Sequence, residues 1–316
     1  MYENKIFLRE EMDRRDFLKT QAKGALLLSM GASGLFLPEP GIAATEPDIA
    51  KVKGAPAAAT RAAVELLGGI QKFVKPGDRV VIKPNMSFNR SPEQASNTHP
   101  EVVRELAVMC KEAQAAKVFI LDHTLASPKM CLLRSGIEEA CKSVDPNMVY
   151  TINESNLYQD VPIPRAVNLN QTQLIKEVLK ADVLIAAPVA KSHSATGVSL
   201  SMKGMMGLIW DRWIMHRQGL DETIVDLCTV LKADLTVIDG SRVLSTNGPH
   251  GPGKVLRENT IIASRDMVAA DACAVESFTW YGRKYKAKQV GHIREAHRRK
   301  FGRMDIDNLT IKTVTI

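Results

Sequence analysis

Residues 181–207, ADVLIAAPVAKSHSATGVSLSMKGMMG, begin as an apolar run and continue as a polar one. The first part is short and rich in aliphatic residues, which predicts a strand buried in the interior of a sheet. Lys191, His193 and Lys203 follow it among serines and a threonine. Charged side chains at the end of a buried strand do little to stabilise it. The stretch therefore predicts a polar site where the strand ends.

Short apolar runs alternate with helical patterns on both sides of this stretch. We predict further strands that end at Pro84 and that span 116–123, 234–240 and 259–264. We predict helices at 60–74, 100–115, 131–144, 171–180, 221–232 and 266–282. Buried strands separated by amphipathic helices are typical of a parallel sheet covered on both faces. The sequence therefore predicts an α/β fold: a mostly parallel sheet with helices on both faces, in a three-layer sandwich.

Polar side chains follow the predicted strands. They are Lys83 and Asn85, Asp122 and His123, Lys191 and His193, Asp239, and Arg265 with Asp266. In open α/β sheets, ligands bind in the crevice beyond the carboxyl ends of the strands, where loops and helix N-termini converge. We therefore expect these side chains to meet at a single edge of the sheet.

The polar half of 181–207 predicts an anion site. Lys191 and His193 are two residues apart in an extended segment, so their side chains point the same way. Small and hydroxyl-bearing residues let backbone amides approach a ligand, and Lys203 adds a positive charge. Carboxylate or phosphate oxygens fit this arrangement. The alternative is a surface loop with solvated lysines.

The candidate site residues divide by role. We predict that Lys191 and Lys203 hold the anion and that His193 is the general acid or base, with Asp239 and Asp271 orienting it or binding a cation. The predicted catalytic residues are His193, Lys191, Asp239 and Asp271. The predicted substrate-binding residues are Lys83, Asn85, Lys203, Gly204, Gly248 and Gly251.

Asp271 stands among alanines in the helix predicted at 266–282. Either the helix dipole alone favours its charge, or a lysine such as Lys83 or Lys191 pairs with it. Burial without a partner raises the pKa of a carboxyl group. We favour pairing, which also suits proton transfer.

Two further segments have open interpretations. In GMMGLIWDRWIMHRQG (204–219), methionines and tryptophans recur at helical spacing, which predicts a core face, a lid over the site or a docking surface. STNGPHGPGK (245–254) is rich in glycine and proline and contains His250. Its glycines permit close backbone approach, so the loop is a flap over the crevice or a plain turn.

The N-terminal residues predict export. The segment RRDFLK (14–19) resembles the twin-arginine signal, and a short apolar stretch and small residues near Ala43 follow it. We predict a signal peptide at 1–44, a linker at 45–59 and one α/β domain at 60–316 with a basic C-terminal segment. The mature chain is then expected in the periplasm, without a transmembrane segment.

Charge and cysteines limit the partners. The net charge is +7, and 282–303 carries nine lysines and arginines against one acid. That segment is either a solvated helix face or a contact for an anionic partner, and no pattern favours nucleic acid. The five cysteines form no C-x-x-C pair, so neither an iron–sulfur cluster nor a structural zinc site is predicted. A divalent metal held by residues from distant loops stays open.

Several segments together resemble a known family. Besides 181–207 they are VVIKPN (80–85), THPEVVREL (98–106), LTVIDG (235–240), NGPHGPG (247–253) and IIASRDMVAADACA (261–274). In this order they are similar to the family catalogued as domain of unknown function three-six-two. The resemblance implies that the candidate residues in these segments form a common site. Many members of that family carry a ferredoxin-type cysteine cluster, which this sequence lacks.

Two classes of function follow. The first is an exported enzyme that acts on a small anionic substrate at a Lys/His/Asp site, by proton transfer or by redox chemistry with a metal or organic cofactor. The second is a non-catalytic periplasmic binding protein or an accessory subunit that docks onto a redox partner. Convergence of the charged candidates in one pocket favours the enzyme.

Overall fold

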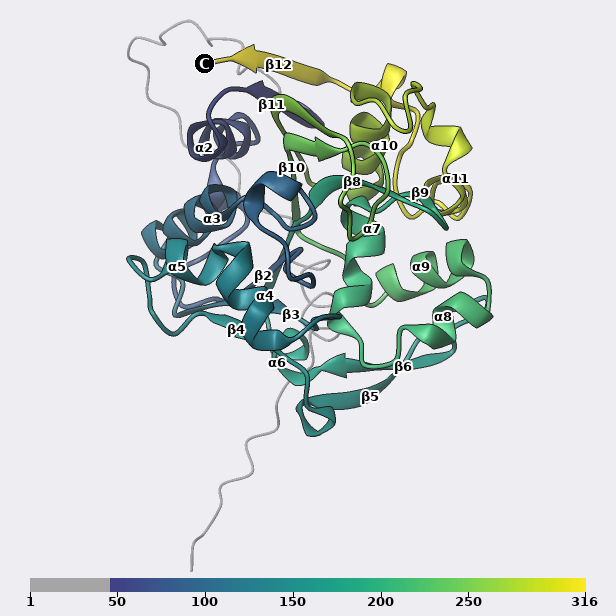
Figure 1. Ribbon diagram of the computed structural model, residues 1–316, viewed down its shortest axis with the longest axis horizontal. Coiled ribbons are helices and arrows are strands. Elements are labelled where there is room, and N and C mark those ends of the chain that lie inside the picture. The colour runs from purple at the N-terminus through teal and green to yellow at the C-terminus, as the bar shows by residue number, and fades with distance from the viewer. Residues whose placement is uncertain (1–45) are drawn as a thin grey trace, which may run out of the picture. The chain divides into compact units, whose positions relative to one another are not determined.

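The computed structural model describes residues 46–316, and Figure 1 shows their arrangement. The predicted twin-arginine segment lies outside the described residues. Within them, no helix combines the length and apolar character needed to cross a lipid bilayer.

A large mixed sheet forms the centre of the fold. Its strands, in spatial order, are β12 (Ile311–Thr315), β1 (Ile49–Lys53), β11 (Val255–Ser264), β10 (Leu235–Leu244), β7 (Val183–Ala187), β2 (Arg79–Pro84), β3 (Lys117–Asp122) and β4 (Val149–Thr151). Off this path, β8 (Val189–His193) pairs with β10 and with β9 (Gly197–Val198). A separate hairpin consists of β5 (Tyr158–Pro162) and β6 (Gln171–Ile175).

Helices cover both faces of the sheet. They are α2 (Pro56–Leu66), α3 (Pro100–Glu112), α4 (Pro128–Ser135), α5 (Ile137–Cys141), α6 (Lys176–Leu179), α7 (Leu200–Gly204), α8 (Trp213–Arg217), α9 (Leu220–Cys228), α10 (Met267–Ser277) and α11 (Gly291–Arg298). Short 3₁₀ turns are η2 (Ile70–Lys72), η3 (Pro92–Gln94), η4 (Ser155–Leu157), η5 (Met205–Leu208), η6 (Ala287–Gln289) and η7 (Ile306–Asn308). In Figure 1, α2, α3 and α5 lie on one side of the strands and α7, α9, α10 and α11 on the other.

Alternate residues of each central strand belong to different cores. In β2, Val80 and Ile82 join the core under α2 and α3, whereas Val81 joins the core under α7, α9 and α10. All three side chains are fully buried. This is the pattern of a strand covered on both faces, so the predicted α/β class is confirmed.

The strands differ in direction, and this decides which predicted site residues can meet. Strands β4, β3, β2, β7 and β10 run parallel, so their carboxyl ends lie at one edge of the sheet. Strand β11 runs antiparallel to β10. The expectation that Arg265 and Asp266 join the other strand ends is therefore wrong. Instead Arg265 pairs with Glu46, and Asp266 caps the N-terminus of α10.

Three predicted elements need correction. Residues 45–59 are not a linker throughout, because β1 pairs with β11 and β12 and α2 begins at Pro56. The helix expected at 60–74 ends at Leu66, before Gly68 and Gly69 with positive φ. The helix expected at 171–180 is mostly strand β6, whose alternating exposed and buried residues suit the hairpin with β5.

The Met/Trp segment forms no continuous helix. It divides into the end of α7, the turn η5 and the short helix α8. Met202, Met205 and Met206 are buried in the core, whereas Trp213 is 73% exposed. Of the three interpretations, the core one fits the methionines.

Candidate functional site

A buried ion pair lies at the carboxyl ends of β2 and β3. Lys83 ends its strand beside Asp122, and their Nζ and Oδ1 atoms are 3.2 Å apart. The other carboxylate oxygen accepts hydrogen bonds from the Met86 backbone and the Ser87 hydroxyl, both at 2.9 Å. Burial lowers the pKa of Lys83, and the charge of Asp122 opposes that effect.

Lys191 approaches this pair from β8. Its Nζ donates to the Ser96 carbonyl at 2.6 Å and lies 4.9 Å from the centre of the Phe88 ring. The side chain is buried, and burial is the largest of the effects that lower its pKa to about 7. The charges of Lys83 and Lys203 act in the same direction, whereas Asp122 acts against them.

Two further cations complete the cluster. Lys203, on α7, is buried, and its Nζ contacts the Met206 sulfur at 3.5 Å. Burial and the charge of Arg212 lower its pKa to about 8. The Arg212 side chain donates to the backbone carbonyl of His123, and its buried Nε has no hydrogen-bond partner in the part of the chain that the structure describes. Both therefore keep donor capacity for a ligand.

His193 borders the same cluster from the end of β8. Its Nδ1 accepts a hydrogen bond from the Ala195 backbone at 3.1 Å, so in the neutral ring Nε2 carries the proton. Burial, followed by the charges of Lys203 and Lys191, lowers its pKa to about 3. The ring is thus a neutral hydrogen-bond donor at physiological pH.

Aromatic rings form one wall next to the cluster. His123 stacks on Trp210 with ring centres 5.3 Å apart, and Tyr158 meets the same indole edge-on at 5.2 Å. The Nδ1 of His123 lies 2.9 Å from the Ile209 carbonyl. The segment after η5 therefore packs against the strand end that carries Asp122, as a wall and not as a separate helical lid.

Asp239 and Asn85 have other partners than predicted. The Asp239 carboxylate accepts from the His99 backbone at 2.7 Å, from Arg242 at 3.1 Å and from the backbone and hydroxyl of Ser241. Asn85 accepts from the Val189 backbone at 3.0 Å. The Asn85 bond joins the end of β2 to the start of β8, and the Asp239 bonds tie β10 to the start of α3 and leave that carboxylate fully occupied, as expected of positioning residues.

Asp271 does not pair with a lysine, so that expectation is wrong. Its two carboxylate oxygens accept the backbone N–H groups of Ser201 and Met202, at 2.8 and 3.0 Å. Burial raises its pKa to about 7, against the effect of these hydrogen bonds. Asp271 thereby fixes the start of α7, two residues before Lys203, because helix N-termini leave backbone donors without partners.

The glycines differ in what they touch. A Cβ on Gly207 would overlap the Asp122 carboxylate and the end of the Lys83 side chain, and a Cβ on Gly248 would overlap the Ser192 carbonyl. Gly251 has a φ of +62°, and a Cβ there would lie 3.4 Å from the Ser96 hydroxyl. A Cβ on Gly204 would meet its nearest atom only at 4.0 Å. Gly207, absent from the predicted set, is the glycine that makes room for the ion pair.

The glycine-rich loop is packed against the site. The Gly248 backbone donates to the Ser192 hydroxyl at 3.0 Å, and Arg90 donates to the carbonyls of His250 and Gly251. Phe88, whose ring meets Lys191, lies 6.2 Å from the His250 ring. The loop therefore covers the Lys191 side of the cluster.

Positive charge exceeds negative charge in the cluster. The cluster holds three buried lysines and a partly buried arginine against one buried carboxylate, Asp122, whose charge acts on Lys83, Lys191 and Arg212. Among residues 46–316, no group of three or more His, Cys, Asp or Glu side chains lies in an arrangement that could hold a metal ion. The charges of the described residues therefore suit an anion.

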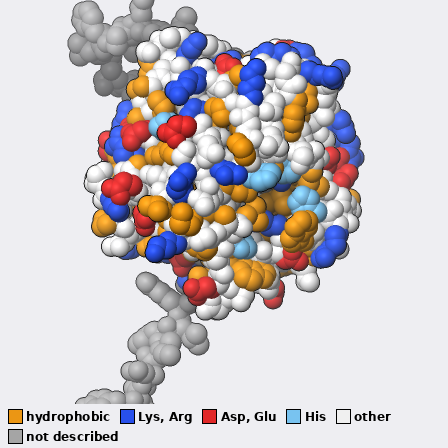
Figure 2. All heavy atoms as spheres, viewed as in Figure 1, with side chains coloured by type: hydrophobic (Ala, Val, Ile, Leu, Met, Phe, Trp, Pro, Cys, Tyr) orange, Lys and Arg blue, Asp and Glu red, His pale blue; other side chains and the backbone are white. Residues whose placement is uncertain are grey.

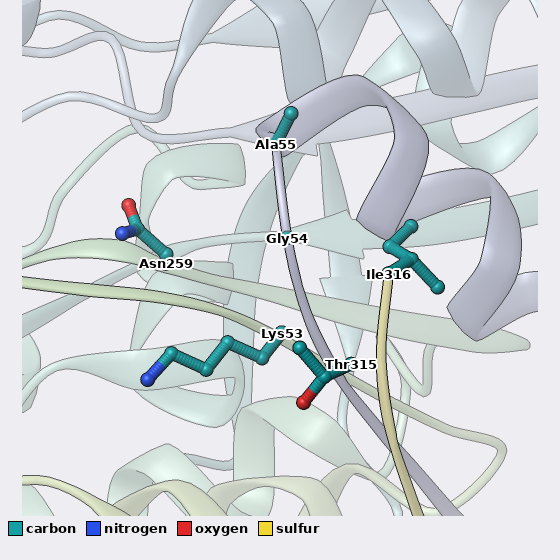
Figure 3. Close-up of a pocket in the computed structure, with 6 residues that line it drawn as sticks. All are labelled: Lys53, Gly54, Ala55, Asn259, Thr315 and Ile316. Carbon is teal, nitrogen blue, oxygen red and sulfur yellow. The ribbon is translucent and has the colours of Figure 1, made fainter.

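Figures 2 and 3 show two different hollows of the described part of the chain. Figure 2 shows histidine, lysine and arginine side chains around a recess with apolar walls, on the face where Figure 1 labels α7 and α9. Figure 3 shows a pocket of about 340 Å³ elsewhere, lined by Lys53, Gly54, Ala55, Asn259, Thr315 and Ile316. Its only ionisable side chain is the exposed Lys53, so it lacks the groups for acid–base chemistry.

Comparison with known proteins places this site in a family. A family model described as "Domain of unknown function (DUF362)" matches residues 80–276, more than half of the chain. The chain belongs to the DUF362 family. Every cluster residue from Lys83 to Arg212, and also Asp271, lies within the DUF362 match.

Similar proteins are known by sequence and by structure. A thylakoid-associated protein of Synechocystis sp. is 30% identical over 225 residues, which cover 68% of this chain and 67% of the relative. The lactate racemase apoprotein from Thermoanaerobacterium thermosaccharolyticum has a TM-score of 0.42 and 13% sequence identity, covering 61% of this chain. The aligned region is 50% of the racemase chain, so this DUF362 chain spans about half of that protein's length.

Sequence reasoning omitted several cluster members from the candidate site. Asp122 and His123 stand at a predicted strand end, and that signal alone could have included them. Arg212 and Phe88 lie in irregular segments of the DUF362 domain, where no periodicity indicates which way a side chain points. Only the packing of those segments brings them to the lysines.

Proposed function

We propose that this DUF362 protein is an enzyme that binds a small carboxylate or phosphate anion among Lys83, Lys191, Lys203 and Arg212 and transfers a proton to or from it. The observation that carries the proposal is the cluster itself: four cationic side chains, three of them buried lysines, interact with one another and share a single buried carboxylate, which pairs with Lys83. Buried charges require partners. An anionic ligand would supply the negative charge needed to balance the cations that Asp122 alone does not neutralise.

The proposed role of each side chain follows from its protonation state and its free hydrogen-bond donors. Lys203 and Arg212 have free donors and hold the anion. Lys191, with a pKa of about 7, exchanges a proton readily near neutral pH and is the proposed acid–base group. Neutral His193 donates from Nε2, and Asp122 keeps Lys83 in place.

A titration with inorganic sulfate tests the anion site. Sulfate keeps its charge across the pH range of interest, and a ligand that binds only the folded state raises the urea midpoint of unfolding. We expect sulfate to stabilise the full chain and to bind at least about tenfold more weakly to Lys203→Met, as expected when a charged hydrogen-bond partner is removed. The exposed Lys288 provides the control, Lys288→Met, with wild-type affinity. Equal affinity in both variants would contradict the anion site.

Catalysis is tested separately from binding. We expect solvent deuterium to enter a carbon position of at least one member of a panel of small carboxylates and phosphate esters, monitored by NMR. Lys191→Met should abolish that exchange while leaving the chain folded. Tight anion binding without exchange for any member would favour the second candidate, a non-catalytic binding protein.

We further propose export to the periplasm by the twin-arginine route. The supporting observation is the segment RRDFLK (14–19) ahead of an apolar stretch. Replacement of both arginines by lysine should leave the chain in the cytoplasmic fraction, whereas the unchanged chain reaches the periplasmic fraction. Equal distribution of the two would contradict this route. Association of the Synechocystis relative with thylakoids concerns that protein, and vesicle sedimentation tests it for this one.

A further inference from the structure

His292 is a fully buried histidine whose ring has no hydrogen-bond partner among residues 46–316. It is the second residue of α11, and its side chain points to the interior together with those of Ile293 and Ala296. Neither ring nitrogen makes a hydrogen bond within the described part of the chain. Leaving a buried polar group without a partner costs free energy, so this ring calls for a functional explanation. It lies outside residues 80–276 of the family match.

Asp221 faces the ring from α9. Its Oδ1 is 3.6 Å from the Nδ1 of His292 and likewise has no hydrogen-bond partner. A Cβ on Gly291 would overlap the other carboxylate oxygen, so only glycine allows the start of α11 to approach so closely. The His292 side chain is the largest influence that lowers the pKa of Asp221, and the His292 backbone N–H adds to it. Asp221 is therefore an ionised acceptor for the ring.

The pair lies on helices that pack around α7, the helix of Lys203: α9 and α10 each contact both α7 and α11. His193 on β8 and Lys203 on α7 are both close enough for charge interaction with His292. Asp221 on α9 favours a proton on the His292 ring, whereas burial, the largest effect, and Lys203 oppose it. On α11 itself, Arg294 acts on Asp221. Without a ligand these influences keep the ring neutral.

We infer that Asp221 and His292 form a proton-accepting dyad of the site, in which His292 binds a proton when an anion occupies the Lys203 side of the cluster. In the protonated dyad Asp221 accepts from Nδ1–H, and the incoming proton from solvent forms a bond to Nε2. No other bond changes, and the positive charge gained is balanced by the anion. The inference rests on the proposed anion site and makes His292 a positioning residue that couples anion binding to proton uptake.

The test measures proton uptake on sulfate binding by calorimetry in buffers of different ionisation enthalpy. At about pH 6, below the pKa values of Lys191 and Lys203, sulfate binding should make the His292 dyad of the wild-type protein take up a proton from solvent. The sulfate affinity should then rise about threefold or more per pH unit lowered. His292→Gln should lose this uptake, with an affinity at about pH 8 within twofold of wild type. The matched control is His297→Gln on the same helix.

Asp221→Asn tests the dyad without changing the histidine. Removal of the carboxylate lowers the proton affinity of His292, so the uptake should move to lower pH. Wild-type proton uptake in both His292→Gln and Asp221→Asn would overturn the inference. Should His292→Gln fail to fold, Asp221→Asn alone decides.

A second readout separates this inference from the proposed function. Absence of sulfate binding by wild-type protein would refute the anion site, and NMR titration of the histidine rings without ligand would then test the dyad. The dyad predicts that His292→Gln raises the pKa of His193 and that Asp221→Asn lowers that of His292. Unchanged histidine titrations would overturn it.

Discussion

Gly207 lies where any side chain would strike the buried ion pair. A Cβ there would overlap the Asp122 carboxylate and the Lys83 side chain. We expect Gly207→Ala to lower the free energy of unfolding by about 1–3 kcal/mol, because overpacking shifts well-packed neighbours. Urea unfolding followed by circular dichroism measures the change.

Gly204, three residues earlier, is the matched control. Its added Cβ would meet only Pro188, at 4.0 Å, and the residue has helical backbone angles. Gly204→Ala should therefore be neutral or stabilising by up to about 1 kcal/mol. Equal destabilisation by both substitutions would show that helix conformation, and not the ion pair, requires the glycines.

At the scale of single residues, the position of a residue after a buried strand predicts that it lies near the site, but it does not predict the residue's role there. Lys83, Asp122 and Lys191 follow buried strands, and the strand-end rule correctly brings them together. The same rule includes Asp239, whose carboxylate instead accepts four hydrogen bonds. Two of its donor residues, Ser241 and Arg242, lie at the bulge that follows Gly240 in β10. Hydrogen-bond partners depend on contacts between distant segments, which a single sequence does not reveal.

At the scale of elements, Asp271 ties α10 to the start of α7. Asp271→Ala would leave the N–H groups of Ser201 and Met202 buried without acceptors. We expect a loss of about 2–4 kcal/mol in unfolding free energy, since each buried unsatisfied donor costs about 1–3 kcal/mol. Asp271→Asn keeps one acceptor oxygen and should lose about half as much. A loss as large for Asn as for Ala would point to the charge itself.

Helices and strands were predictable where the hydrophobic period is long and unbroken. The patterns at 100–115, 116–123 and 221–232 correspond to α3, β3 and α9. The pattern at 171–180 failed because the two alternating buried residues, Thr172 and Leu174, include only one aliphatic side chain, too few to distinguish a hairpin strand from a helix turn. In 204–219, tertiary contacts of η5 with β2 and β3 replace helical continuity.

At the scale of the whole molecule, the lysine cluster makes stability depend on pH. The pKa of Lys191 is lowered to about 7 in the fold, against about 10.4 in an unfolded chain. Between these values the unfolded state binds more protons, so the free energy of unfolding rises with pH. From about pH 7 to about pH 9 we expect a gain of about 1–2 kcal/mol from this group. Urea unfolding at several pH values measures it.

Substitution isolates the contribution of Lys191. Lys191→Met has no titrating group at this position, so its stability should rise less with pH than that of the wild type. Its advantage over the wild type should be largest at and below about pH 7 and should fall as the pH rises to about 9. A parallel rise in both proteins would contradict the lowered pKa, with exposed Lys300→Met as the control for general charge effects.

The overall architecture could be predicted from the sequence, but the directions of the individual strands could not. Alternating helices and aliphatic runs were sufficient for a sheet covered on both faces. They carry no information on whether a strand such as β11 runs with or against its neighbour. That direction moved Arg265 and Asp266 to the opposite edge, and only the long-range pairing could show it.

The placement of β1 has a consequence for how the chain is made. This strand lies between β11 and β12, whose residues follow it by more than 200 positions in the sequence. During synthesis, β1 thus has no strand to pair with until residues 255–264 of β11 have left the ribosome. A product truncated before β11 would therefore leave β1 unpaired and the sheet with an open edge, which quality-control proteases can recognise.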